Sequence, residues 1–187
     1  MPQAKFMEVV RDGLTSLPQD MKALMRVVED PDIDDDSRID AAGAILHLLS
    51  GQNAIPGLRG TIGYIDDIIV MLLVIERAHA RSPEAMTKHE DESSSLFGRW
   101  KDNCAAMRAY LGDLVKVMER AADSVKTLSL QGHTANQCVQ DVNSTDWLYE
   151  SIIAELVRLD LSEAEISRAV KSVDQILPPL RQRAFVK

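Results

Sequence analysis

The stretch of sequence that decides the fold is Tyr64-Ile-Asp-Asp-Ile-Ile-Val-Met-Leu-Leu-Val-Ile-Glu-Arg-Ala-His-Ala80. It contains neither glycine nor proline, and every residue from Ile68 to Ile75 is apolar. A helix that is hydrophobic on all sides has to be buried, and this run is far shorter than the roughly 18 residues of a membrane-spanning helix. We therefore expect Tyr64–Ala80 to be a helix at the centre of a soluble helical core.

A second helix is predicted just before this one in the chain. Asp30–Asp36 contains five aspartates and a proline, which indicates a turn that supplies a carboxylate cap to the helix that follows. That helix is predicted over Asp35–Leu49, where apolar residues form one broad stripe. Gly51–Gly63 is rich in glycine and contains Pro56, so it indicates a loop. Together these segments predict a helical hairpin.

The N-terminal segment predicts two short amphipathic helices. Apolar residues recur at helical spacing over Ala4–Leu17 and again over Pro18–Glu29. Proline lacks the N–H that a helix interior requires, and it is better placed in a first turn. We therefore expect one helix to end before Pro18 and another to begin there.

A polar segment separates this N-terminal portion, residues 1–82, from the C-terminal half. Residues 83–95 contain a proline and three consecutive serines, so we expect them to be a polar linker. Residues 96–187 then predict a helical bundle of three helices with coiled-coil-like seams. Its first helix is expected to run unbroken from Leu96 to Leu128, because apolar residues follow heptad steps there.

The other two helices of this half are marked by apolar spacing and by a cap. One spans Trp147–Leu159, and the other begins at a capping box of Ser162 and Glu165. Pro178-Pro179 should interrupt or bend the last helix.

Composition favours an all-α fold and limits the partners. Aromatic residues make up 4% of the chain, and we expect no strands. The net charge is −8, so the chain should repel phosphate backbones, and we expect no nucleic-acid partner. Cys104 and Cys138 lack the spacing of a disulfide framework, and the charged N-terminus lacks the apolar stretch of a secretory signal. We expect reduced thiols and a cytoplasmic location.

The hairpin carries a family pattern, over about residues 31–80. A helix ending in Leu-Leu-Ser is followed by an Ile-Pro loop and by Gly-Tyr-Ile-Asp-Asp at the start of an apolar helix. This pattern resembles the YkvA-like family, catalogued as domain of unknown function 1232. The matching residues are Ser50, Ile55, Pro56, Gly63, Tyr64, Asp66 and Asp67. The resemblance implies a helical hairpin, often found in bacterial proteins and sometimes associated with membranes, and it implies no known reaction.

The chain departs from the family pattern at three loop positions. Gly51 stands where the family has proline, Asn53 lies near its first aspartate, and Gly57 replaces its second aspartate. Two of the four carboxylates that could have faced each other are therefore missing.

The residues that could carry chemistry are His47, Asp66 and Asp67. Two carboxylates in one helical turn could bind a hard cation, and His47 is predicted on the helix that folds against them. The alternative is structural, because acidic residues near a helix N-terminus are favoured by the backbone dipole, and a buried histidine is usually hydrogen-bonded in a core. We assign no catalytic residue and expect no cofactor. The histidines of the polar segments, His89 among them, are interpreted as solvated.

Three functions remain open from the sequence. The first is a non-catalytic helical interaction or scaffold protein that binds a protein partner, or a second copy, through the C-terminal helices. The second is a metal-dependent or small-ligand function centred on His47, Asp66 and Asp67. The third is peripheral membrane association through the apolar helix Ile68–Ile75.

Overall fold

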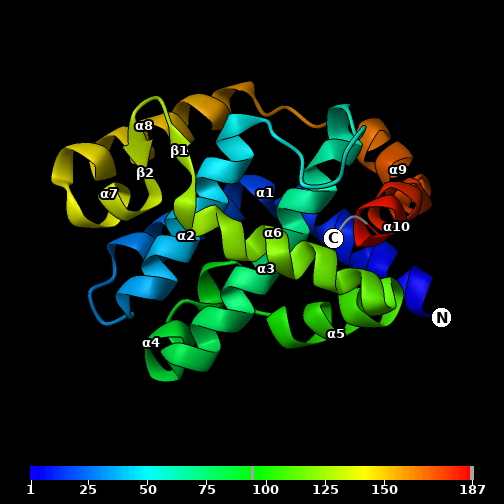
Figure 1. Cartoon of the computed structure of the whole chain (residues 1–187), viewed down its shortest axis with the longest axis horizontal. Helices are drawn as coiled ribbons and strands as arrows, with labels where there is room; N and C mark the ends of the chain where they lie inside the picture. Colours follow the sequence, from blue (N-terminus) through cyan, green and yellow to red (C-terminus); the bar gives the residue numbers. More distant parts are fainter. Residues whose placement is uncertain (94, 186–187) are drawn as a thin grey trace.

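The computed structural model describes residues 1–93 and 95–185, and it is an all-α helical bundle (Figure 1). The α-helices are α1 (Pro2–Glu29), α2 (Asp35–Ser50), α3 (Tyr64–Arg81), α4 (Pro83–Thr87), α5 (Trp100–Leu111), α6 (Val115–Ser124), α7 (Ala135–Gln140), α8 (Val142–Arg158), α9 (Glu163–Lys171) and α10 (Leu177–Phe185). Short 3₁₀ turns connect several of them: η1 (Gly60–Gly63), η2 (Glu90–Glu92), η3 (Gly112–Leu114), η4 (Val125–Thr127) and η5 (Val173–Ile176). The strands are β1 (Ser129–Leu130) and β2 (His133–Thr134).

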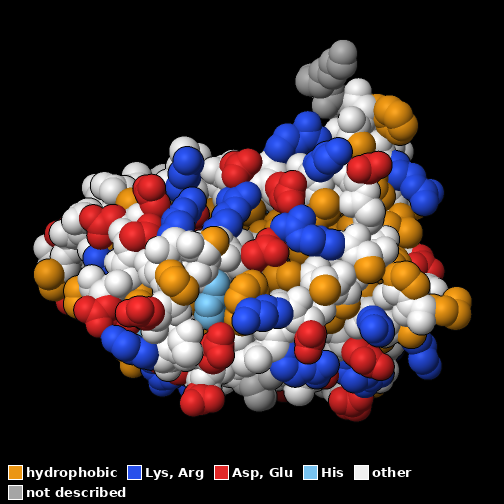
Figure 2. Space-filling model, turned by 90° about the horizontal axis from the view of Figure 1, so that it is seen from below, with side chains coloured by type: hydrophobic (Ala, Val, Ile, Leu, Met, Phe, Trp, Pro, Cys, Tyr) orange, Lys and Arg blue, Asp and Glu red, His pale blue; other side chains and the backbone are white. Residues whose placement is uncertain are grey.

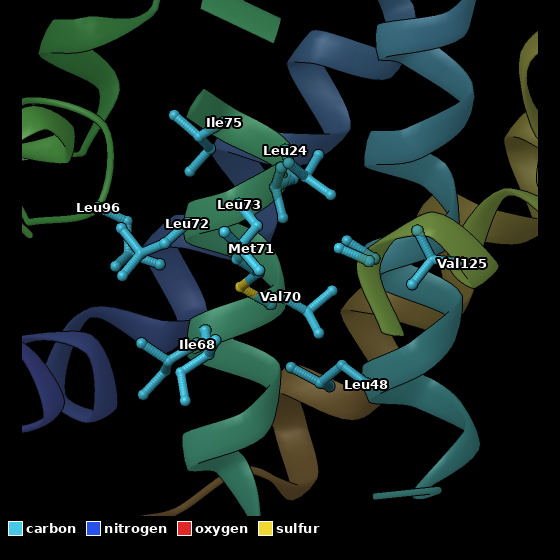
Figure 3. Close-up of a cluster of buried hydrophobic side chains, with 14 of the residues drawn as sticks. Leu24, Leu48, Ile68, Val70, Met71, Leu72, Leu73, Ile75, Leu96 and Val125 are labelled. Atoms are coloured by element: carbon cyan, nitrogen blue, oxygen red, sulfur yellow. The ribbon is translucent and has the colours of Figure 1, made fainter. Parts of the chain in front are cut away.

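Helix α3 lies at the centre of the bundle, as its composition predicts. Every residue from Ile65 to Ile75 is buried, and α3 packs against α1, α2, α5 and α6. Figure 3 shows apolar side chains of α3 meeting Leu24 of α1 and Leu48 of α2. The Ile68–Ile75 stretch is therefore explained by core packing. Among the described residues, no helix is both long and apolar enough to cross a membrane.

The bounds of α2 follow the predicted signals closely. The Asp34 side chain caps the helix by accepting a 2.9 Å hydrogen bond from the Ser37 amide. Gly51 ends the helix at a φ of 64°, a conformation that favours glycine. The hairpin of α2 and α3 is confirmed, and these two helices pack directly on each other.

The predicted break at Pro18 is wrong, because α1 is one continuous helix. Leu14, Leu17 and Met21 are all buried, so one apolar stripe runs past the proline. Packing of that stripe stabilises the helix against the loss of a single backbone hydrogen bond at Pro18.

The predicted long helix over Leu96–Leu128 is also wrong, because it is divided at Gly112. Gly112 has a φ of 55° and a ψ of −133°, which an L-residue rarely adopts. The chain turns there and continues as η3 and α6. The heptad residues Met107, Leu111 and Met118 are buried, so they pack inside this chain.

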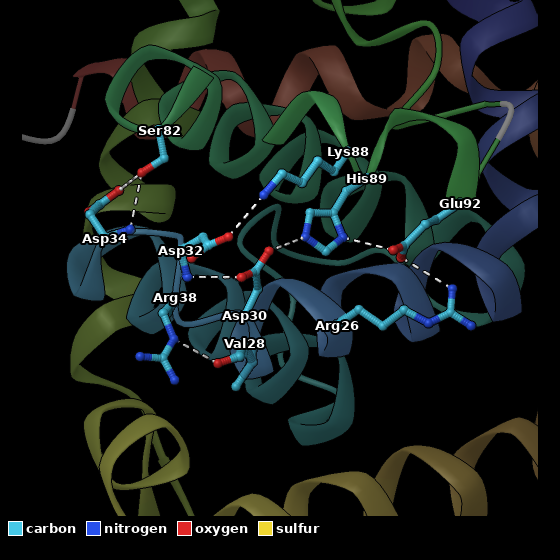
Figure 4. A network of polar contacts seen from close by, with 10 residues as sticks. All are labelled: Arg26, Val28, Asp30, Asp32, Asp34, Arg38, Ser82, Lys88, His89 and Glu92. Atoms are coloured by element: carbon cyan, nitrogen blue, oxygen red, sulfur yellow. Dashed lines mark hydrogen bonds and ion pairs between the residues drawn. The ribbon is translucent and has the colours of Figure 1, made fainter. Parts of the chain in front are cut away.

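Residues 83–95 were expected to be a polar linker, and the described ones, 83–93 and 95, form packed structure. Met86, Ser93 and Ser95 are buried, and α4 and η2 lie in this segment. Figure 4 shows how it is held: His89 Nε2 and Asp30 Oδ2 lie 2.8 Å apart, and His89 Nδ1 and Glu92 Oε1 are also 2.8 Å apart. One continuous cluster of buried apolar residues contains side chains from both sides of the segment.

The expectation of no strands is wrong for one hairpin. β1 and β2 pair antiparallel, with Ser129 opposite Thr134 and Leu130 opposite His133. Gln131 and Gly132 both have positive φ, at 50° and 87°, which suits a tight two-residue turn. The strands are too short to leave an alternating pattern in the sequence.

The C-terminal half contains more helices than the three predicted. The capping box of Ser162 and Glu165 is confirmed at the start of α9. The chain then leaves the helix at η5, and Pro178 and Pro179 fall in the first turn of α10, where proline is tolerated.

Candidate functional site

The structure brings the three predicted site residues together between α2 and α3. His47 lies near the end of α2, and Asp67 lies in the first turn of α3. His47 Nδ1 and Asp67 Oδ1 are 2.7 Å apart, and both side chains are almost completely buried. Because a carboxylate can only accept, the imidazole donates through Nδ1.

Asp66 faces the connecting loop, and its hydrogen bonds come from there. Its Oδ2 accepts from the Ala54 amide and, at 3.3 Å, from the Ile55 amide. Its Oδ1 is buried without a hydrogen-bond partner among the described residues. The C-terminal helix also reaches this loop, because Arg183 Nη1 donates a 2.6 Å hydrogen bond to the Ala54 carbonyl.

Burial governs the protonation of this cluster. Burial, together with the charge of Asp67, raises the pKa of Asp66 to about 7. Burial also raises the pKa of Asp67, although its hydrogen bond with His47 opposes this. Desolvation lowers the pKa of His47, but the bond to Asp67 and the two nearby carboxylates outweigh it, so the pKa is raised overall. Burial therefore favours the protonated form of both carboxyl groups.

Two surface cavities flank the pair. One, of about 670 Å³, is lined by Tyr64, Asp67 and Arg158 among others. The second, of about 530 Å³, is lined by His47, Arg120 and Arg183 among others. Asn53 lines both cavities, so the pair and its loop stand between them.

The loop departures from the YkvA-like pattern have structural explanations. Asn53 Nδ2 donates a 2.7 Å hydrogen bond to the Leu58 carbonyl, which closes the loop on itself. Gly57 has a φ of 83°, which disfavours the aspartate of the family pattern. The loop is therefore held by Asn53 and by Asp66.

The donor set does not assemble a metal centre. Within residues 1–93 and 95–185, no three histidine, cysteine, aspartate or glutamate side chains are grouped so that they could hold a metal ion. Asp66 Oδ2 is already hydrogen-bonded to backbone amides, and Asp67 is bonded to His47. The contacts instead tie the loop to the hairpin.

A second buried polar cluster was not anticipated from the sequence. Asp20 is fully buried in α1 and accepts hydrogen bonds from Ser16, Ser93 and Ser95. Burial raises its pKa to about 6, although these hydroxyl groups oppose the shift. With the His89 contacts of Figure 4, this cluster fixes the segment after α4 against α1. The interpretation of His89 as a solvated linker residue is therefore wrong.

The most unusual surface of the molecule is the outer face of α8. Val142, Tyr149, Ile153 and Val157 are 73%, 51%, 40% and 82% exposed. The adjacent side of α8, with Leu148 and Ile152, is buried, and α8 packs on α7, α1 and α2. The apolar spacing that predicted this helix, which includes Leu148 and Ile152, follows only this inner stripe. The outer spacing of seven, four and four residues was a visible signal that a second stripe exists.

Other parts of the surface are more ordinary. On the face shown in Figure 2, acidic and basic side chains are interspersed. Such a distribution is typical of a solvated surface.

Comparisons with known proteins assign neither a family nor a function to this chain. No family model, no curated protein and no solved structure matches the chain. The resemblance of the hairpin to the YkvA-like family therefore stays a prediction.

Proposed function

We propose that this chain is a non-catalytic helical interaction protein that binds another protein through the outer face of α8. The observation that carries the proposal is the row of exposed apolar side chains formed by Val142, Tyr149, Ile153 and Val157. We call this row the α8 stripe. Residues three, four or seven apart lie on the same side of a helix, so the four side chains form one row along it, in which Asp146 lies between Val142 and Tyr149.

The distribution of exposed apolar residues supports this choice. Among the described residues, the other large hydrophobic side chains that are exposed are Met1 and Phe185, which lie close to the two ends of the chain. Isolated apolar residues are normal on a protein surface, whereas a contiguous group is typical of an interaction site. The α8 stripe is such a group, and it lies on a regular helix rather than on a loop.

The proposal refines the expectation that the C-terminal helices bind a partner. The heptad residues of α5 and α6 that suggested an interface are buried inside this chain. We therefore place the interface on α8. The inner stripe of this helix packs against the rest of the chain, and the α8 stripe is exposed. A cytoplasmic location fits two buried free thiols, Cys104 and Cys138, and it is part of the proposal.

A second candidate function is small-ligand binding beside His47, Asp66 and Asp67. The observation that favours it is the unpartnered Oδ1 of Asp66, because buried polar atoms usually have partners. An Asp66→Asn variant of the full chain tests it by mass spectrometry under native conditions. A small molecule that is retained by the wild type and lost from this variant supports ligand binding, and its absence from both contradicts it.

The interaction proposal is tested by affinity capture in the native host. The wild type is compared with a triple variant, Tyr149→Gln, Ile153→Gln and Val157→Gln, which removes the stripe while keeping good helix formers. Phe185→Gln is the matched control, because it removes an exposed apolar side chain elsewhere. We expect a stoichiometric partner with the wild type and the control, and its loss from the triple variant. Equal capture by all three proteins contradicts the proposal.

A further inference from the structure

We infer that the partner presents a basic amphipathic helix, which lies along α8 with its apolar side on the α8 stripe. This inference rests on the proposed function and specifies the chemistry of the partner. The evidence for a basic partner is the charge of the residues near the α8 stripe, which is independent of the exposure of the stripe.

The segment that carries the stripe is strongly acidic. Between residues 141 and 160 the acidic residues are Asp141, Asp146, Glu150, Glu155 and Asp160, and the basic residue is Arg158. Arg158 already lies 3.7 Å from Glu155, within the same helix. The segment from Asp141 to Asp160 therefore carries a net negative charge.

Two of these carboxylates lie among the apolar residues themselves. Asp146 is four residues after Val142 and three before Tyr149, and Glu150 is three before Ile153. This spacing places both on the same side of the helix as the stripe. Both are exposed, and neither forms an ion pair or hydrogen bond with any residue that the structure describes. A partner with Lys or Arg at matching positions would neutralise them on binding.

A second copy of the same chain does not fit this surface. A two-fold dimer brings the same patch of both copies together. An axis through the middle of the stripe, between Tyr149 and Ile153, would place Glu150 of one copy near Glu150 of the other. Two carboxylates brought together in this way oppose association of the two copies. The same negative charge would repel an anionic membrane.

The dimensions of the stripe define the length of the partner segment. From Val142 to Val157 a helix rises about 22 Å, since each residue adds about 1.5 Å. A partner helix of about four turns would cover it, with apolar residues at spacings of three and four and basic residues on the flanks. One helix on one helix buries less area than a standard protein–protein interface.

The test begins with photo-crosslinking from the centre of the stripe in the native host. Ile153 is replaced by benzoylphenylalanine in the full chain, and the crosslinked peptide is sequenced. We expect a segment of another protein with a net positive charge and apolar residues at helical spacing. An acidic or neutral segment, a segment of this same chain, or lipid overturns the inference.

The second step measures the charge contribution with that segment as a synthetic peptide. Asp146→Lys with Glu150→Lys should weaken binding at least tenfold. Asp91→Lys with Asp113→Lys, which changes the net charge equally at exposed sites away from α8, should leave the affinity unchanged. Unchanged affinity in the first variant overturns the inference while leaving the proposed function intact. No crosslink at all from position 153 contradicts the proposed function itself.

Discussion

Gly43 of α2 lies directly against the backbone of Val125 in η4, and this contact joins the two halves of the chain. A Cβ atom at position 43 would stand 2.6 Å from the Val125 carbonyl carbon, which is closer than real Cβ contacts allow. The hairpin and the C-terminal half therefore share a contact surface that accepts no side chain at this point.

The contact predicts that Gly43→Ala destabilises the protein. The added methyl group meets rigid backbone, so α2 and η4 have to separate, at a cost of about 1–3 kcal/mol. Gly63→Ala is the control, because its Cβ would stand 3.5 Å from the nearest side-chain atoms of Asn53, an ordinary van der Waals contact. Urea unfolding of both variants checks this, and a Gly43→Ala variant as stable as the control would contradict the shared contact.

Asp66 predicts an unusual dependence of stability on pH. Its pKa is about 7 in the folded chain, against 3.8 for an unperturbed aspartate, so between these values the folded state binds a proton that the unfolded state releases. Stability then falls as the pH rises through this window. His47, whose pKa is raised above 6.5, acts in the same direction at the upper end.

Asp66→Asn removes the contribution of the Asp66 carboxyl group to the pH dependence of stability. We expect the wild type to lose about 3 kcal/mol more than the variant between pH 5 and pH 8, since about two pH units of this window lie below the folded-state pKa and each unit corresponds to about 1.4 kcal/mol. Urea unfolding at the two pH values measures it. Parallel losses in the two proteins would show that Asp66 ionises in the folded state without cost.

The two cysteines should be unreactive in the folded protein. Cys104 and Cys138 are buried, and burial raises the pKa of their thiols to about 12 and about 11. The thiolate is the reactive form, so a disulfide-exchange reagent should label neither at neutral pH until the chain unfolds. Rapid labelling of the native protein would contradict the packing around them.

Pro18 predicts a stabilising substitution. Its ring prevents a backbone hydrogen bond inside α1, and Pro18→Ala should stabilise the protein by about 1 kcal/mol if the helix is continuous. Pro2→Ala is the control, because proline in a first turn interrupts no hydrogen bond. If α1 were instead two helices, Pro18→Ala would bring no gain or a loss in thermal unfolding.

The sequence predicted the elements whose signals are local and strong. Local signals predicted the apolar helix α3, a carboxylate cap for α2 and the capping box at Ser162. The structure contains all three, with Asp34 as the cap of α2. The pairing of His47 with Asp67 could also be anticipated, because a hairpin brings the end of α2 to the start of α3. The partners of Asp66 could not, since they depend on the path of the loop.

The errors have a common cause in tertiary packing. Pro18 indicates a break, but the buried stripe of α1 overrides it, and the heptad pattern across Gly112 conceals a turn that the glycine permits. The polar residues of the segment after α4 include Ser93, Ser95 and His89, which are buried because Asp20 and Asp30 lie opposite them. None of these relationships is visible in one segment alone.

The most direct test of the α8 stripe is amide hydrogen exchange of the full chain, free and in the captured complex. We predict that added protection is concentrated in Val142–Arg158, because a bound helix restricts the opening of α8. Unchanged exchange in α8, with new protection in the loop after α2, would contradict the account and place the functional surface beside His47.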